Sequence, residues 1–283
     1  MKFVYIADTH IGCREGAGYQ MQRRYGGSYT LELFGVLADR VRQEGDVDFV
    51  LHGGDAVDEA TPENLDLAKA LFALMPCPVY LTLGNHDLTE SGAREKWFEV
   101  APELFPNGQT EASFVWGGVR FDLLTSHWGK TKYFWNSSEP QIPWFSEEQL
   151  EVLRTGPTSP QRVIISHAPP CGVPLEQTGY EKPIHSPEGD FENVVESLCA
   201  TYAPVLWLGA HNHMNLLSTV GKTHRVTCSS LTETPFEFKV FEIREGHVSM
   251  KTVSLRDQVS FAGPYDYTKR YVQGREIDRE FVL

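Results

Sequence analysis

Short apolar stretches alternate with amphipathic ones over the first third of the chain. Residues Tyr29–Gln43 carry apolar side chains at helical spacing, and Pro62–Met75 is a second candidate helix with Thr61 as a favourable N-cap. Three short apolar stretches lie around these helices and predict buried strands. A β-α-β-α-β order of this kind favours a largely parallel sheet covered by helices. The three strands are expected at Lys2–Ala7, Asp48–Leu51 and Pro78–Leu83.

The middle of the chain predicts a hairpin, two more helices and a series of strands. Ser113–Trp116 and Val119–Thr125 flank a Gly-Gly pair and are expected to form the hairpin. Ser146–Leu153 begins with a capping-box pattern, and Phe191–Tyr202 is expected to be helical as well. The further strands are expected at Val163–Ser166, Val205–Leu208, Asn215–Val220, His224–Ser229, Phe236–Ile243 and Val248–Ser254.

These elements fit one α/β domain, residues 1–257, in which two mixed sheets pack together with helices outside. A chain of 283 residues with 41% hydrophobic residues can bury a large core. Residues 258–283 are polar and aromatic by turns and predict no clear element. We expect this C-terminal tail to pack on the domain or on a second subunit of a homo-oligomer.

Charge and cysteine usage narrow the function classes. The formal net charge of -13 disfavours duplex nucleic acid, because binding to it needs clustered Lys and Arg. A small anionic substrate can still bind where metal ions reverse the local sign. Five scattered cysteines without a CxxC pair predict reduced thiols. The N-terminal apolar stretch is too short for a signal peptide, and no apolar run could span a membrane, so a cytoplasmic location is expected.

Candidate chemistry gathers where the predicted strands end. Carboxyl ends of neighbouring parallel strands converge on one crevice, so these side chains should meet there. A single Asp at a strand end is more often a turn former, and a lone His is more often a core residue. Their occurrence after five successive strands favours a metal site instead. The candidate ligands are Asp8, His10, Asp55, Asn85, His167, His211 and His213.

Seven oxygen and nitrogen donors are too many for one four-coordinate ion and suit two divalent ions that share a carboxylate. Mixed carboxylate, amide and imidazole donors favour Mn, Fe or Zn. Two ions about 3.5–4 Å apart stabilise the attacking and leaving oxygens of a phosphoryl displacement and turn bound water into hydroxide at neutral pH. His86 is the candidate to protonate the leaving oxygen, and Asp87 is expected to orient it.

In order, these residues resemble the motifs of the calcineurin-like metallophosphoesterase superfamily: Asp8-Thr9-His10, Gly54-Asp55, Gly84-Asn85-His86-Asp87, His167 and His211-Asn212-His213. The resemblance implies a four-layer α/β/β/α sandwich. It also implies that Asp8, His10, Asp55 and His213 bind one ion, that Asp55, Asn85, His167 and His211 bind the other, and that His86 is catalytic. One departure is Ala210, which stands where the family has Gly.

Different segments of the chain resemble different subfamilies. Protein phosphatases of this superfamily carry an Arg after the second Asp of G-D-x-V-D, where this chain has Glu59, so that class is disfavoured. Asp8–Gly12 is similar to DNA-repair exonucleases, whereas Trp144–Leu150 and Thr234–Phe236 are similar to bacterial phosphodiesterases of cyclic nucleotides and glycerophosphodiesters. We expect a phosphodiesterase for small substrates. A DNA exonuclease and a non-catalytic metal-stabilised binding protein stay as alternatives, although the retained His86-Asp87 pair argues against the latter.

Substrate choice is expected in loops next to the metal ligands. Arg14, Arg23 and Arg24 follow the first ligands and could grip a phosphate, with Tyr19 and Tyr25 stacking on a base, while a solvated loop is the other interpretation. Residues 169–188, with Tyr180 and His185, could form a lid. His127 is a surplus histidine that is structural or lies beside the ligands and the substrate.

Overall fold

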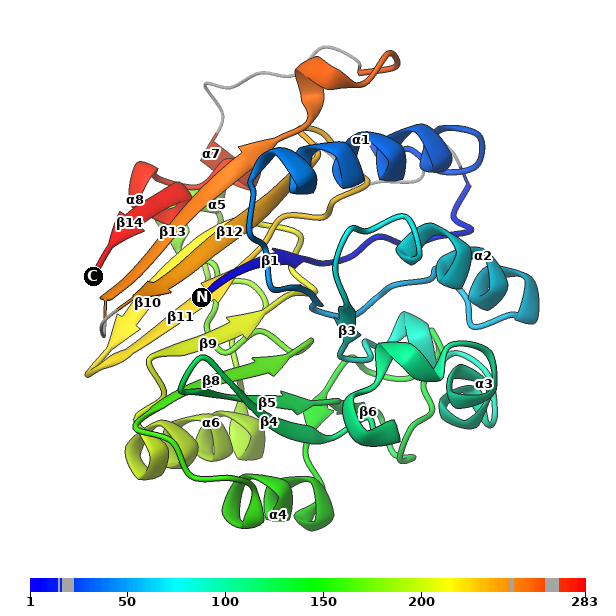
Figure 1. Ribbon diagram of the computed structural model, residues 1–283. Coiled ribbons are helices and arrows are strands. Elements are labelled where there is room, and N and C mark those ends of the chain that lie inside the picture. Colours follow the sequence, from blue (N-terminus) through cyan, green and yellow to red (C-terminus); the bar gives the residue numbers. More distant parts are fainter. Residues whose placement is uncertain (15, 17–22, 245–246, 263–269) are drawn as a thin grey trace.

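Two six-stranded mixed sheets pack face to face in the computed structural model, which describes residues 1–14, 16, 23–244, 247–262 and 270–283 (Figure 1). In the first sheet, β1, β2 and β3 are parallel, whereas β12, β13 and β14 add antiparallel strands beside β1. Its order is β14 (Glu280–Val282), β13 (His247–Ser254), β12 (Glu237–Arg244), β1 (Lys2–Ile6), β2 (Phe49–His52) and β3 (Val79–Leu81).

The second sheet has a parallel centre, β11-β9-β8-β5, with an antiparallel strand on each edge. A two-stranded ribbon of β6 (His127–Trp128) and β7 (Pro143–Trp144) lies outside it. The order of the second sheet is β10 (Leu216–Val220), β11 (Thr223–Thr227), β9 (Leu206–Gly209), β8 (Gln161–Ser166), β5 (Val119–Leu124) and β4 (Ala112–Trp116).

Helices cover the outer face of each sheet. Helices α1 (Tyr29–Gln43), α2 (Pro62–Phe72) and α3 (Ala93–Val100) share a core with the first sheet, and α4 (Glu147–Thr155) and α6 (Gly189–Tyr202) share one with the second. The short helices are α5 (Leu175–Thr178), α7 (Arg270–Gln273), α8 (Glu276–Arg279) and the 3-10 turns η1 (His86–Leu88), η2 (Pro102–Leu104), η3 (Pro106–Gly108) and η4 (Arg256–Gln258).

A third core lies between the sheets and joins them. Phe3 of β1 stacks on Phe241 of β12 at 5.0 Å and meets Phe121 of β5, in the other sheet, edge-on at 5.5 Å. Three buried cores between four layers confirm the expected α/β/β/α sandwich. Among the described residues, no helix is long and apolar enough to cross a membrane.

Most predicted elements are present with shifted ends. Helix α1 has the predicted bounds, whereas α2 ends three residues earlier than expected, and residues up to Met75 continue as hydrogen-bonded turns. The backbone N–H of Ser146 donates to Gln149 Oε1 at 2.9 Å, which is one half of the predicted capping box of α4. Helix α3 was not predicted, because only Ala93 and Trp97 on it are fully buried.

The C-terminal tail continues the first sheet. Strand β14 pairs with β13, and Arg279 forms an ion pair with the buried Glu237 of β12 at 2.6 Å. Helix α8 adds the buried Asp278, which accepts a hydrogen bond from the backbone of Leu217. Residues 270–283 therefore connect both sheets at the edge that carries β10 and β14.

Candidate metal centre

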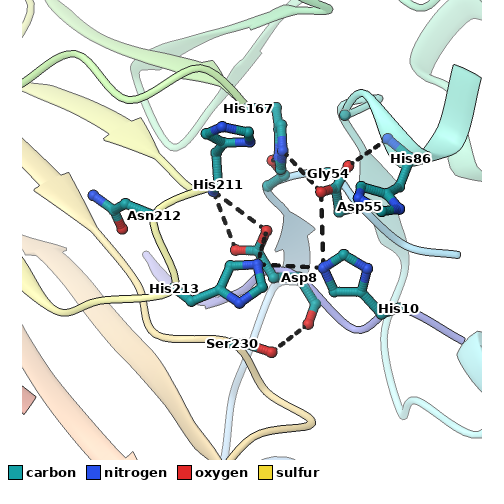
Figure 2. A network of polar contacts seen from close by, with 12 residues as sticks. Asp8, His10, Gly54, Asp55, His86, His167, His211, Asn212, His213 and Ser230 are labelled. Atoms are coloured by element: carbon teal, nitrogen blue, oxygen red, sulfur yellow. Dashed lines mark hydrogen bonds and ion pairs between the residues drawn. The ribbon is translucent and has the colours of Figure 1, made fainter. Parts of the chain in front are cut away.

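The loops after five parallel strands bring the candidate ligands to one place. Figure 2 labels all of them except Asn85. From the first sheet, β1 leads into Asp8 and His10, β2 into Asp55, and β3 into Asn85. From the second sheet, β8 leads into His167, and β9 leads into His211 and His213. All seven are buried or nearly so, although they span more than 200 positions of the sequence.

The backbone at these strand ends adopts an unusual conformation. Asp8, His10, Asp55, His211 and His213 have φ between 41° and 70°, the left-handed region that residues other than Gly rarely occupy. Such residues cost about 1–3 kcal/mol each and cluster at functional sites. Hydrogen bonds between neighbouring loops hold this conformation, because the N–H of Asp8 donates to the carbonyl of Gly54 at 3.0 Å and that of His10 to Asp55 at 3.0 Å.

A first cluster consists of Asp8, His10 and His213. The Nε2 atoms of the two histidines lie 3.3 Å apart, and His213 Nε2 is 3.3 Å from Asp8 Oδ1. The Nδ1 atoms face carboxylates instead, Asp58 at 3.2 Å from His10 and Glu233 at 3.1 Å from His213. Donation from Nδ1–H to a carboxylate leaves the Nε2 lone pair for a cation, which is the usual arrangement of metal-binding histidines.

A second cluster consists of Asp55, His167 and His211, with Asn85 beside it. His167 Nδ1 donates to the Gly53 carbonyl at 2.9 Å, which turns Nε2 toward Asp55 Oδ2 at 3.2 Å. Both His167 Nε2 and Asn85 Nδ2 are buried without a hydrogen bond among the described residues. Asn85 Oδ1 lies 3.1 Å from His211 Nδ1. A buried, unsatisfied imidazole nitrogen beside carboxylate and amide oxygens fits a divalent cation.

Asp55 stands between the two clusters. Its Oδ2 atom is 3.2 Å from His167 Nε2 and 3.8 Å from His10 Nε2, so one carboxylate faces ligands of both groups. Asn212 lies between His211 and His213 in the sequence but points away from the centre (Figure 2) and donates to Thr227 Oγ1 at 3.2 Å. Ala210 does not adopt the left-handed conformation that would require the family's Gly.

His86 lies at the edge of the centre, and its imidazole is partly exposed. Its backbone N–H donates to Asp55 Oδ1 at 2.9 Å, and its Nδ1 donates to the Asp58 carbonyl at 2.7 Å. We expected Asp87 to orient this ring, but the Asp87 carboxylate accepts from the backbone of Gly84 and Val57 and ties the two loops together. Asp58 is the acidic residue that contacts His86. Burial, with the nearby Asp55, raises the pKa of Asp87 to about 7.

The pKa values of the four candidate histidine ligands are shifted in different directions. Burial lowers the pKa of His10 and of His211 well below the ordinary range, so both are neutral at pH 7. Burial also acts against protonation of His167 and His213, but Asp55 raises the pKa of His167 to about 9, and Glu233 with Asp8 raises that of His213 to about 10. A metal ion that binds these two residues must therefore displace protons.

The predicted substrate-binding residues occupy different environments. Arg24 lines the cavity over the centre and is buried, with its guanidinium 3.0 Å from Glu233 Oε1 and 3.3 Å from Asp58 Oδ1. Arg14 and Arg23 are exposed and do not line this cavity. His127 is buried outside the cavity, where its Nδ1 accepts from the backbone of Tyr133 at 3.3 Å.

The prediction for the tyrosines is not met at Tyr25, and two acidic residues of the site were not predicted from the sequence. Tyr25, expected to stack on a base, is buried against Phe236, and Tyr19 lies outside the described residues. Glu233 stands in the loop after β11, directly before the segment Thr234–Phe236 that resembles bacterial phosphodiesterases, but none of the metal-ligand motifs includes it. Asp58 belongs to the same Gly-Asp motif as Asp55 and could have been found there.

Comparison with known proteins matches most of the chain to one family. The family model described as calcineurin-like phosphoesterase matches residues 1–215. A probable glycerophosphodiester phosphodiesterase, GpdQ, from Arcobacter nitrofigilis is 25% identical over 258 residues, with 84% of each chain covered. The DNA double-strand break repair protein Mre11 of Methanococcus maripaludis is 31% identical over 112 residues, which are 38% of this chain and 28% of that protein.

Solved structures share the fold. A dimetal phosphatase from Danio rerio superposes with a TM-score of 0.68 at 17% identity, covering 89% of this chain and 96% of that one. The purple acid phosphatase PPD1 of yellow lupin gives 0.58 at 14% identity, covering 98% of this chain and 56% of that one.

Proposed function

The chain belongs to the calcineurin-like phosphoesterase family, a family of hydrolases that act on phosphoric esters, and on this basis we propose that it is a phosphodiesterase for small substrates that works with two divalent metal ions. The position of Asp55 carries the proposal. Its Oδ2 lies 3.8 Å from His10 Nε2 and 3.2 Å from His167 Nε2, which supports its role as a ligand that two ions would share. A single structural ion would not need it there.

The two ions would be held by this chain's own strand-end residues, and Mn, Fe and Zn suit the donors. When bound, they supply positive charge for the phosphoryl oxygens and lower the pKa of a coordinated water. The ligands of the first ion would be Asp8, His10, Asp55 and His213, and those of the second Asp55, Asn85, His167 and His211.

His86 would hold the proton for the leaving oxygen. The hydrogen bond from its Nδ1 to the Asp58 carbonyl fixes the ring, so that Nε2 is the nitrogen available to a substrate. The imidazole is about 29% exposed and lines the cavity, which gives a substrate access to it. An accessible histidine of this kind argues against a binding protein that merely uses metal for stability.

Diester hydrolysis of a small molecule is favoured over nuclease activity by three observations. The likeness to GpdQ extends over 84% of both chains, whereas the likeness to Mre11 is confined to 112 residues. The cavity over the centre has a volume of about 330 Å³, which suits a small molecule rather than a nucleic-acid strand. The net charge of -13 adds repulsion toward a polyanion.

The test is hydrolysis of bis-p-nitrophenyl phosphate, p-nitrophenyl phosphate and linear DNA by the full chain with added Mn²⁺. We expect the diester to be hydrolysed faster than the monoester, and linear DNA not to be degraded from its ends. Asp55→Ala should abolish hydrolysis of the diester. Degradation of DNA with no diester turnover would favour the exonuclease, and bound metal without any hydrolysis would favour the binding protein.

A further inference from the structure

The cavity over the metal centre has a wall that the reaction itself does not require. Besides the residues of the centre, Arg24 and Asn212, it is lined by side chains that carry no formal charge when histidine is neutral. These are Gln141, Tyr180, Ile184, His185, Met214 and Tyr271.

The wall joins two segments that are distant in sequence. Tyr180 comes from the segment 169–188, and Tyr271 comes from α7 in the C-terminal tail. Their rings meet edge-on with centroids 6.0 Å apart, and their hydroxyl oxygens are 3.2 Å apart. The amide of the buried Gln177 donates to the carbonyls of Tyr271 at 2.9 Å and Asn215 at 3.1 Å, which ties both segments to the second sheet. The two tyrosines therefore stand on an anchored wall.

The charges of the described residues along the cavity disfavour a second anionic group on the substrate. Arg24 is the only Arg or Lys among the described residues that line it, and its guanidinium is already within 3.3 Å of Glu233 and Asp58. Among the described residues of this wall, a substrate with a second phosphate would find no unshared cation. Tyrosine rings, a thioether and an amide instead suit a flat, uncharged ring, by aromatic contact and by hydrogen bonds to its edge.

We propose that Tyr180 and Tyr271 form a subsite for a flat, uncharged ring, such as a nucleobase or an aryl group, attached to the phosphate that the centre holds. The inference rests on the proposed function and gives the C-terminal tail a part in substrate selection. It predicts preference for ring-bearing diesters over aliphatic ones.

Steady-state kinetics on two diesters test the subsite, thymidine 5′-(p-nitrophenyl phosphate) with rings and glycerophosphoethanolamine without. We expect Tyr271→Ala and Tyr180→Ala each to raise KM for the ring substrate about tenfold or more, with kcat changed by less than about threefold. Values for the aliphatic diester should stay within about threefold. Tyr271→Phe and Tyr180→Phe, which keep the ring, should behave as wild type. Equal losses on both substrates, or no loss on either, would overturn the subsite.

Equilibrium binding separates this proposal from the hydrolase proposal. Calorimetry with the Mn²⁺-loaded chain should give binding of adenosine 5′-monophosphate that Tyr271→Ala weakens about tenfold or more, while binding of glycerol 3-phosphate is unaffected. Nucleotide binding that depends on Tyr271 without any diester turnover would refute only the hydrolase. Equal affinity of wild type and Tyr271→Ala for the nucleotide, with equal metal content and melting temperature, would refute the subsite.

Discussion

Oε1 of Glu233 lies 3.1 Å from Nδ1 of His213 and 3.0 Å from Nε of Arg24. Burial of Glu233 opposes its charge, but His213 and Arg24 outweigh that effect and hold its pKa at about 2. The same guanidinium reaches Asp58, which is 3.2 Å from His10 Nδ1. One arginine thus supports the two carboxylates that orient both histidines of the first cluster.

Glu233→Gln should weaken metal binding although Glu233 is not itself a candidate metal ligand. The variant loses the charge that fixes the His213 tautomer, and loss of such a partner typically costs 10- to 100-fold in affinity. Calorimetric titration of the metal-free chain with Mn²⁺ measures this affinity. Glu196→Gln is the matched control, because Glu196 is a half-exposed ion-pair partner of Arg225. Unchanged Mn²⁺ affinity of Glu233→Gln would mean that Glu233 does not orient His213.

His86→Gln should lower kcat and leave metal content unchanged. If His86 protonates the leaving oxygen, the loss should be about 10²–10⁴-fold for a diester with an alkyl leaving group, which needs the proton. For bis-p-nitrophenyl phosphate the loss should be at least tenfold smaller, since p-nitrophenolate leaves without help. Equal losses on both substrates would assign His86 to charge stabilisation instead of proton transfer.

The sequence predicted which residues of the candidate metal centre lie together more completely than it predicted their surroundings. Asp8, Asp55 and His167 each lie within three residues of the end of a short buried strand, and the parallel order of those strands dictates where they meet. Glu233 and Tyr271 have no such local signal. Glu233 reaches His213 only through tertiary packing, where Arg24 also donates to it. Tyr271 reaches the cavity in the same way, and its carbonyl accepts a hydrogen bond from Gln177.

The structure of the C-terminal tail could likewise not be predicted from local sequence patterns. Strand β14 has three residues, of which only Phe281 is buried, so its sequence gives no period to recognise. Its pairing with β13 is decided by the free edge of the sheet and by the ion pair between Arg279 and Glu237. Sequence periodicity cannot reveal an element whose stability comes from partners far away in the chain.

Gly84→Ala should abolish the function of the centre by displacing Asp55. A Cβ atom at position 84 would lie 2.2 Å from Asp55 Oδ1 and 2.5 Å from the Asp55 nitrogen, closer than atoms can approach. We expect loss of Mn²⁺ binding and a lower melting temperature. Gly35→Ala in α1 is the control, because a Cβ there meets nothing within 4 Å, and helix propensity should stabilise the chain by about 1 kcal/mol. Normal Mn²⁺ binding by Gly84→Ala would show that the strand-end loop can move apart.

The buried Lys239 should make stability depend on pH in the alkaline range. Its Nζ donates to the Asp278 carbonyl at 2.9 Å and to Thr252 Oγ1 at 3.1 Å, and burial lowers its pKa from 10.5 to about 8. Between these values the unfolded chain binds the proton more strongly than the folded one, so the free energy of unfolding rises with pH across this window. Below pH 8 both states are protonated, and the contribution is constant. The rise is about 3 kcal/mol, because one pKa unit corresponds to about 1.4 kcal/mol.

Lys239→Met isolates this effect. Urea unfolding at pH 7, 8.5 and 10 measures the free energy of unfolding of both chains. The value for wild type minus that for Lys239→Met should increase as the pH rises, since the variant has no amine to titrate at this position. Lys222→Met, at an exposed position, is the control and should follow wild type at every pH. Since other groups titrate equally in all three chains, only the difference is diagnostic. Parallel curves for wild type and Lys239→Met would mean that the buried amine keeps its ordinary proton affinity, and that its hydrogen bonds to Asp278 and Thr252 compensate fully for its removal from water.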